Sequence, residues 1–387
     1  MVERSTSFRA SPARTTRALS RMGAWLAGTM LAGSALAQSV VPAPAAPAVP
    51  ASAAAASAAP TSAAAQPRAA VVLKPESGPL AAQGSFGFGG KADKVRRSLS
   101  GIACPVRTGT TAHCLVAFDE GNEVRTVTLD GDDYRLSSTP IRLGEKGTEI
   151  DAEGVASDGR GYLYVTGSHA RTRGDCKNNP ASRQVWRIPY DGREGLSARA
   201  LAGAPIESSR AAWRAMRRVA DLGAARCPGR GGLNVEGLAW FDGRLVLGLR
   251  QGTAQGRVRW LAFDAEALFT GEEVSMHVHT APLGRGLGVR DLATVADGVL
   301  MLIGPDDDPG NADQPWRIVL WALRGEPLVT ELATLALPAV PADGCSRRIK
   351  PEAMAVLDES PQHYRIAVLS DGLCDGGPMR FTVPRGH

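Results

Sequence analysis

Short apolar runs joined by tight turns recur along this chain. In the clearest copy, residues 237–241 form one apolar run, Asp242 and Gly243 follow, and residues 244–249 form a second run. An Asp-Gly pair between two such runs is typical of a β-hairpin with a two-residue turn. The pattern therefore predicts two buried antiparallel strands over this stretch.

Four weaker copies of this hairpin pattern occupy much of the remaining chain. Each contains a polar residue, a small residue, an apolar strand, a turn and a second apolar strand. The copies begin at Ser100, Glu153, Asp291 and Glu352, and the clearest copy begins at Glu236. Strand-built units that recur about every 50 to 80 residues indicate propeller blades.

Further strands are predicted between the hairpins. Alternating runs predict a third strand at residues 123–129, 184–190, 257–263 and 316–323. Residues 134–143 and 274–281 predict fourth strands that return to the next hairpin. A β-sandwich also contains many short strands, but it does not repeat a whole four-strand unit. The prediction is an all-β fold, a β-propeller of five or six four-stranded blades.

One long interval interrupts the repeats. Residues 208–222 begin with two serines that could cap a helix, and Trp213, Met216 and Ala220 fall on one helical face. We therefore expect one inserted helix. A sixth, degenerate blade would have to come from this interval or from the Gly-rich N-terminal segment, with residues 95–98 as an extra strand that closes the ring.

The first 37 residues have the pattern of a secretory signal peptide. Several arginines precede a short apolar run at 22–32, and an Ala-Leu-Ala site ends at Ala37. Residues 38–72 are almost all Ala, Pro, Val and Ser, which predicts a disordered linker. The propeller domain is expected at 73–387. The mature chain is expected to contain no membrane span and to be periplasmic or secreted.

The charge of the chain lies mostly in the expected leader. Removal of residues 1–37 lowers the formal charge from +5 to about +1. No run of Lys and Arg interleaved with aromatic residues is present. We therefore expect no nucleic-acid partner, because such binding needs a basic patch.

Six cysteines follow the expected cleavage site. An even number in an exported chain favours disulfides. The competing interpretation, a zinc site, lacks the usual C-x-x-C spacing. Two of the cysteines flank the first hairpin turn and two bracket the last repeat, so the preferred bridges are Cys104–Cys114, Cys176–Cys227 and Cys345–Cys374.

The residues that begin the repeats should meet at one end of the central channel. The first strand of each propeller blade lines this channel, and four of the five repeats begin with a carboxylate. Converging carboxylates repel one another unless a cation, protons or nearby arginines compensate them. Oxygen ligands suit a hard divalent cation, of which calcium is the expected one. The expected ligands are Glu153, Glu236, Asp291 and Glu352.

The ends of the second strands should lie at the same mouth, because an antiparallel hairpin returns to where it began. Glu236 and Arg250 are therefore predicted neighbours. The residues expected to contact a small anionic ligand or a protein partner are Arg250, His169, Arg171, Asp306 and Asp371. The simpler alternative is that acidic residues at blade ends cap turns, bond to backbone amides or form salt bridges that lock adjacent blades.

Three short motifs carry a family resemblance. They are Glu153-Gly-Val-Ala, Glu236-Gly-Leu-Ala-Trp and Gly248-Leu-Arg250. With them, residues 95–383 resemble the uncharacterised bacterial family called domain of unknown function 3616, which implies an exported propeller and no particular activity. The Glu-Gly-Leu-Ala repeat is also similar to the esterase-like phytases. It is more faintly similar to gluconolactonase-type propellers, and this resemblance implies that Glu153 or Glu236 would bind a metal.

Two functions fit these observations. The first is an exported ligand- or partner-binding propeller with an acidic, cation-binding channel mouth. The second is a metal-dependent hydrolase of phosphoesters or lactones, in which a bound cation activates water and Arg250 holds the anionic group.

Overall fold

The computed structural model describes residues 71–89, 92–193, 195–271, 273–325, 328–339 and 345–386. All of them belong to the second of the two compact units of the chain, Gln66–His387. The expected signal peptide and nearly all of the expected linker lie outside the described residues. The first described strand, β1 (Val71–Leu73), begins within the last two residues of that linker.

Five antiparallel sheets form the five blades of a propeller. In blade 1 the strands are β3 (Leu99–Thr108), β4 (Thr111–Phe118), β5 (Glu123–Asp130) and β6 (Asp133–Leu136). In blade 2 they are β8 (Ala152–Ser157), β9 (Tyr162–Gly167), β10 (Val185–Pro189) and β11 (Glu207–Ser209). In blade 3 they are β12 (Val235–Phe241), β13 (Arg244–Leu249), β14 (Arg257–Asp264) and β15 (Met276–Pro282).

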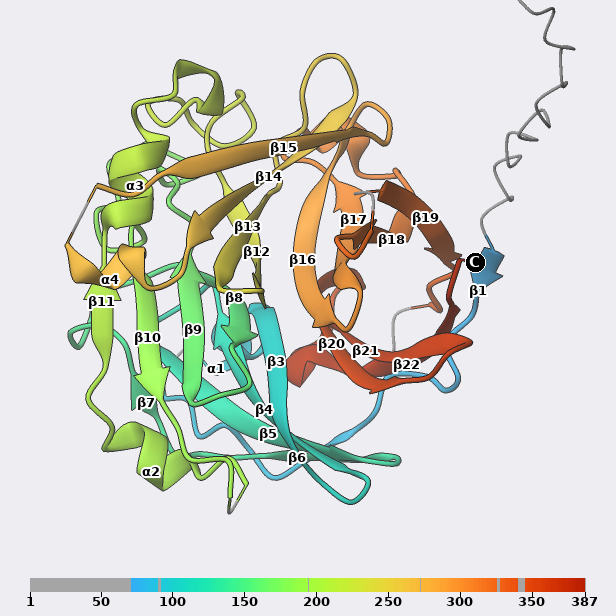
Figure 1. Cartoon of the computed structure of the whole chain (residues 1–387). Coiled ribbons are helices and arrows are strands. Elements are labelled where there is room, and N and C mark those ends of the chain that lie inside the picture. The colour runs from blue at the N-terminus through green and yellow to red at the C-terminus, as the bar shows by residue number, and fades with distance from the viewer. Residues whose placement is uncertain are drawn as a thin grey trace, which may run out of the picture. The chain divides into compact units, whose positions relative to one another are not determined.

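The last two blades complete the ring. In blade 4 the strands are β16 (Leu287–Val295), β17 (Gly298–Pro305), β18 (Trp316–Ala322) and β19 (Leu328–Leu335). In blade 5 they are β20 (Lys350–Glu359), β21 (His363–Asp371) and β22 (Met379–Pro384). The innermost strands β3, β8, β12, β16 and β20 contact one another in this cyclic order around the centre (Figure 1). The propeller prediction is confirmed, with five blades.

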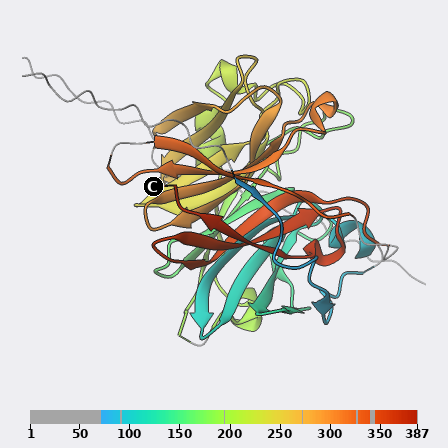
Figure 2. The same ribbon diagram turned by 90° about the vertical axis from the view of Figure 1, so that its right-hand side faces the viewer.

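An N-terminal strap, residues 71–83, ties three blades together. Strand β1 pairs in parallel with β19 of blade 4, and β2 (Ala82–Gln83) pairs in parallel with β6 of blade 1. Between them the Glu76 nitrogen donates to the Arg380 carbonyl at 2.8 Å, and the Leu80 nitrogen donates to the Pro378 carbonyl at 2.9 Å. Figure 2 shows this blue segment passing along the red strands of blade 5. The strap therefore covers the edge of the blade that has only three strands of its own.

The hydrophobic core is divided into five clusters, and each fills the space between two neighbouring blades. Leu115 of blade 1 packs with Val165 of blade 2, for example, and Leu302 of blade 4 packs with Ile366 of blade 5. Burial of apolar surface stabilises such contacts by about 25 cal/mol per Å². The alternation of apolar positions in each strand serves two clusters at once, one on each face of the sheet.

Close approach of the inner strands explains the glycine at the second position of the repeats that begin at Ser100 and Glu153. A Cβ atom added to Gly101 would lie 2.0 Å from the Glu153 carbonyl oxygen of the next blade. A Cβ atom added to Gly154 would lie 2.4 Å from the Leu238 nitrogen. Only glycine lets these backbones pack so closely around the axis.

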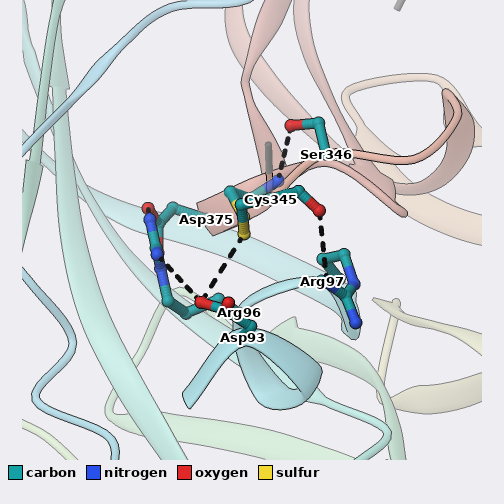
Figure 3. Close-up of a disulfide and its surroundings, with 7 residues drawn as sticks. Asp93, Arg96, Arg97, Cys345, Ser346 and Asp375 are labelled. Atoms are coloured by element: carbon teal, nitrogen blue, oxygen red, sulfur yellow. Dashed lines mark hydrogen bonds and ion pairs between the residues drawn. A yellow bond between two sulfur atoms is a disulfide. The ribbon is translucent and has the colours of Figure 1, made fainter. Parts of the chain in front are cut away.

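One prediction about local structure is wrong. Residues 95–98 do not form a closing strand, because residues 92–96 form helix α1 (Ala92–Arg96). Arg96 of this helix binds Asp375 beside the Cys345–Cys374 bridge, with Nε and Oδ1 at 2.9 Å and Nη2 and Oδ2 at 2.6 Å (Figure 3). The helix is thereby anchored to the end of blade 5, next to η3 (Cys374–Gly376).

The predicted inserted helix at 208–222 is present but shorter than expected. Residues 207–209 instead form β11, because they pair with β10 and complete blade 2. The remainder forms α3 (Ala211–Met216) and η1 (Ala220–Leu222). The other short elements are α2 (Ala198–Ala202), α4 (Ala267–Thr270), η2 (Pro309–Asn311) and β7 (Ile141–Arg142).

Three disulfides join the six cysteines. They are Cys104–Cys114, Cys176–Cys227 and Cys345–Cys374, the pairing that the sequence favoured. Disulfides form and persist in oxidising compartments, so the bridges are consistent with a protein outside the cytosol. Among the described helices, none has the length and apolar character needed to cross a membrane.

Candidate functional site at the channel mouth

Each innermost strand contains a β-bulge at the same place. The ladder of β12 with β13 skips Glu236, for example, because Val235 pairs with Leu249 and Gly237 pairs with Gly248. A bulge leaves one residue without an opposite partner and re-aims its side chain. The bulged residues of the five blades, called the bulge ring below, are Ser100, Glu153, Glu236, Arg290 and Glu352.

The bulge in blade 4 falls at Arg290, one residue before the predicted Asp291. Asp291 is fully buried, and its carboxylate accepts the Leu292 nitrogen at 2.8 Å and the Met354 nitrogen at 2.6 Å. Burial raises the pKa of Asp291 well above its ordinary value. Asp291 therefore lies between the backbones of blades 4 and 5. Arg290 occupies the position in the bulge ring that was predicted for Asp291.

The same bulges fix which residues end the second strands. Following the ladder one step past each bulge gives Asp119, Ser168, Arg250, Gly304 and Asp371. The sequence had placed His169 and Asp306 here, one and two residues too late. His169 is fully buried with Nε2 3.1 Å from Thr166 Oγ1, and burial lowers its pKa to about 3.

A partly buried arginine, Arg250, and a fully buried one, Arg290, hold the acidic side chains of the bulge ring. Arg250 Nη1 lies 3.0 Å from Glu236 Oε1, which confirms the predicted neighbours. Arg290 Nη2 lies 3.4 Å from Glu236 Oε2 and also contacts Glu352. Burial alone would raise the pKa of Glu236, but Arg250 and Arg290 lower it to about 2. Two of the predicted cation ligands, Glu236 and Glu352, are thus already compensated by arginine.

Asp307 extends this network into the loop after β17. Its Oδ1 atom lies 3.1 Å from Arg250 Nε and 2.9 Å from Arg173 Nη2. Neither Asp307 nor Arg290 is predicted as a site residue from the sequence pattern. Arg290 was missed because its neighbour Asp291 has the charge shared by the other repeats.

A first cavity of about 450 Å³ opens at this mouth, and it is predominantly acidic. Eight acidic and five basic side chains line it, among them Asp119, Asp151 and Glu153. Within the described residues, no lysine or arginine forms an ion pair with any of these three carboxyl groups. Ser100 Oγ donates to Glu153 and Ser168 Oγ donates to Asp151, whereas Asp119 Oδ1 is buried and accepts no hydrogen bond. We call this first cavity the acidic cavity.

The environment of the acidic cavity favours protonation of these three groups. Burial, and then the charge of Asp151, raise the pKa of Asp119 to about 7. Burial raises the pKa of Asp151 to about 6, against the hydrogen bond from Ser168. Burial and Glu236 raise the pKa of Glu153 well above its ordinary value. Each group is therefore short of positive charge.

A second cavity of about 410 Å³ shares part of its wall with the first and has the opposite balance. Five basic and three acidic side chains line it. Burial, followed by Arg290, Arg348 and Arg250, lowers the pKa of Lys350 to about 8. We call it the basic cavity. The residues that line both cavities are Arg173, Arg250, Arg348 and Lys350.

The two cavities contain most of the residues predicted from the sequence. The acidic cavity is lined by Glu153, Glu236, Glu352, Arg250, Arg171 and Asp371. Asp306 lines the basic cavity, whereas His169 and Asp291 line neither. One sequence signal would have identified further residues of the acidic cavity. Asp151, Asn234 and Lys350 each stand two residues before a bulged glutamate and line the acidic cavity.

No group of three or more His, Cys, Asp and Glu side chains in the described part of the chain has an arrangement suited to a metal ion. The calcium site stays a prediction. Of its four expected ligands, Glu153 is the one that lines the acidic cavity and has no arginine partner.

The fold and the site together define a five-bladed β-propeller with charged cavities at one mouth of its channel. The chain belongs to the family described as "Protein of unknown function (DUF3616)", which its residues 104–190 and 222–375 match. No curated protein matches the chain.

Several solved structures share the general architecture at low identity. An α-L-arabinofuranosidase from Podospora anserina is 8% identical, with 81% of this chain and 96% of that chain covered and a TM-score of 0.43. An exo-1,5-α-L-arabinanase from a bovine ruminal metagenomic library is 8% identical, with 75% and 97% covered and a TM-score of 0.37. A protein from Lactobacillus plantarum is 9% identical, with 74% and 70% covered and a TM-score of 0.32. Similarities this distant carry no argument about function.

Proposed function

We propose that this domain binds a small polar ligand through a positively charged group that enters the acidic cavity. The observation that carries the proposal is the set of three carboxyl groups, Asp119, Asp151 and Glu153, which line a cavity without a cationic partner among the described residues. A buried carboxylate that lacks a partner costs free energy. A ligand cation would supply the missing charge.

The positive charge could come from a metal ion or from an organic ammonium group. Calcium takes six to eight oxygen ligands at about 2.3–2.6 Å. An ammonium group donates three hydrogen bonds and accepts looser geometry. Both sources share the chemistry that the acidic cavity offers, so the experiment has to separate them.

Thermal denaturation of the purified domain with two probes tests the proposal. Calcium chloride and putrescine dihydrochloride are each compared with sodium chloride at equal ionic strength. A ligand at a hundredfold excess over its Kd stabilises the folded state by about 2.7 kcal/mol, so we expect the melting temperature to rise by several degrees with one probe. The probe that produces the rise identifies the source of the charge.

Variants place the effect in the acidic cavity. Asp151→Asn should abolish most of the shift, whereas Asp191→Asn, an exposed carboxylate that lines neither cavity, should leave it intact. The proposal fails if neither probe shifts the melting temperature, or if both variants reduce the shift equally.

Hydrolysis is a second candidate, and a specific observation favours it. Carboxyl groups whose pKa lies near 6 and 7, as for Asp151 and Asp119, are suited to general acid–base catalysis near neutral pH. The purified domain should be assayed with generic phosphoesters and lactones in the presence of calcium, of manganese and of a chelator. Activity that Asp119→Asn removes would support the hydrolase. Equal turnover by the parent and the variant would exclude these groups from catalysis.

We also propose that the protein is periplasmic or secreted. The three disulfides support a location in an oxidising compartment. Cell fractionation with N-terminal sequencing tests this, and a mature chain that begins at Gln38 is the expected result.

A further inference from the structure

The basic cavity holds more positive charge than its own acids compensate. We propose that it is a separate subsite for a small anionic group, a phosphate or a carboxylate. A ligand that fills both cavities would then carry both charges, and this last step rests on the proposed function. The charge available to a ligand is set by which of the five basic side chains are already paired.

Two of the arginines that line the basic cavity are neutralised by the channel network. Arg250 lies 3.0 Å from Glu236 and 3.1 Å from Asp307. Arg290 binds Glu236 and Glu352. Only 1% of Arg290 is exposed, and its Nε atom is buried without a hydrogen-bond acceptor. The network therefore leaves one deeply buried donor of the wall unused.

Arg348 is the basic side chain that the network does not neutralise. It is exposed and lines both cavities, and no acidic side chain of the described chain forms an ion pair with it. Lys350 contacts Asp371. The lowered pKa of Lys350 has Arg290, Arg348 and Arg250 among its causes, after burial. These side chains concentrate positive potential where the two cavities join.

Of the three acidic residues of the basic cavity, Asp307 is paired with Arg250 and Arg173, and the other two are engaged within their own loop. Asp306 Oδ1 accepts from Asn311 Nδ2 at 2.8 Å and from the Asp308 nitrogen at 2.9 Å. Asp308 Oδ1 accepts the Gly310 nitrogen at 2.9 Å. These carboxylates hold the loop after β17 in its turn. They leave Arg348 available for a ligand.

Trp316 adds a flat apolar wall to the basic cavity. The Arg290 guanidinium carbon lies 5.7 Å from the centre of its ring. An arginine that is held against an aromatic ring is well placed to recognise a planar or tetrahedral anion. The class of group expected here is a carboxylate or phosphate attached to an apolar part that packs on Trp316.

Isothermal titration calorimetry with inorganic phosphate and with succinate tests the subsite and separates its two sources. The titrations are made at constant ionic strength with sodium chloride. We expect one anion to bind, and Arg348→Gln to weaken that binding at least fivefold. Arg347→Gln is the matched control, because Arg347 is also exposed but lines neither cavity. It should bind the anion as tightly as the parent.

Other outcomes overturn the subsite. They are no binding of either anion at tens of millimolar, or equal weakening by both arginine variants, which would indicate a general charge effect. Asp191→Asn, which removes an exposed carboxylate that lines neither cavity, should leave anion binding unchanged within twofold, and an equal change there would also contradict a specific subsite. Failure of the putrescine and calcium probes with retained anion binding would sink the proposed function and leave this subsite standing.

Discussion

Charge balance within the bulge ring depends strongly on Arg290. The four other members of the bulge ring are one serine and three glutamates, and Arg290 contacts two of those glutamates, Glu236 and Glu352. A buried guanidinium pays a large desolvation penalty, but removal of one partner from a buried pair is worse because it leaves the other charge uncompensated. The ring is thus stable only as a set.

Substitution of Arg290 by methionine should destabilise the domain by about 3–5 kcal/mol, because Glu352 loses its buried counter-charge. Glu236 loses one of its two arginine partners and keeps Arg250. Urea denaturation at pH 7 measures the change. The double variant Arg290→Met, Glu352→Gln should recover part of the loss, since it removes a stranded carboxylate as well. A single variant as stable as the parent would show that the arginine is not needed for charge balance.

Asp119 predicts an unusual pH dependence of stability. Its pKa is about 7 in the folded protein and 3.8 as a reference for the unfolded chain, so the folded state binds the proton more tightly. Folding takes up a proton between these values, and stability from this group falls as the pH rises from about 4 to about 7. Asp119→Asn removes that loss.

The melting temperature of Asp119→Asn relative to the parent should therefore rise from pH 4.5 to pH 7 and stay constant above pH 7. Differential scanning calorimetry across this range measures the difference. Asp191→Asn serves as the exposed control and should follow the parent at every pH. A difference that shrinks toward pH 7 would contradict the raised pKa.

At the level of elements, the sequence predicted the hairpins well and their phase less well. The Asp242-Gly243 turn is observed between β12 and β13, and the four predicted third strands agree with β5, β10, β14 and β18 within a residue. Local turn chemistry and alternation carry this information. A bulge moves the register of a strand by one residue, and the repeat pattern allows either Arg290 or Asp291 at the bulged position. The pairing of β16 with β17 shows that the bulged residue is Arg290.

The differences at residues 95–98 and 208–222 have another origin. Residues 207–209 would suit the start of a helix by themselves. They form a strand instead, because pairing with β10 completes blade 2. Residues 95–98 were assigned as a strand because a closed ring was expected to need one. The strap supplies that closure instead. Pairing between distant segments is not encoded in a local pattern, and this is why both differences fall at blade edges.

Gly154 offers a test of close packing between inner strands. Gly154→Ala would place a Cβ atom 2.4 Å from the Leu238 nitrogen, so the backbones of blades 2 and 3 would have to separate. Overpacking of this kind costs about 1–3 kcal/mol, and a lower melting temperature is expected. Gly174→Ala is the control, since its Cβ atom meets nothing within 4 Å. Equal melting of both variants would argue against the close approach.

At the scale of the whole molecule, closure of the propeller depends on the strap. The Glu76 carboxylate accepts from Arg365 Nη2 at 3.0 Å and from Thr382 Oγ1 at 2.7 Å, and thereby fastens the strap to blade 5. Five blades in a ring make each interface depend on the next. A weak closure would lower the stability of the entire domain.

Glu76→Ala should reduce the free energy of unfolding by about 1 kcal/mol, the net value of one or two hydrogen bonds with partial exposure. Thermal melting measures it. Glu273→Ala, which removes an exposed acid paired with Arg218 at the surface, should change the melting temperature much less. If the two variants melt together, the strap contributes no more than an ordinary surface contact.

The strap also has a consequence for the order of folding. Glu76 and Thr382 are 306 residues apart in the chain, so this contact requires a very large loop closure and should form late. Until it forms, β22 presents an open row of backbone donors and acceptors. Such an edge is a template on which a second molecule can add a strand. The segment that finishes the ring is therefore also the cover that keeps a nearly folded propeller from joining its neighbours.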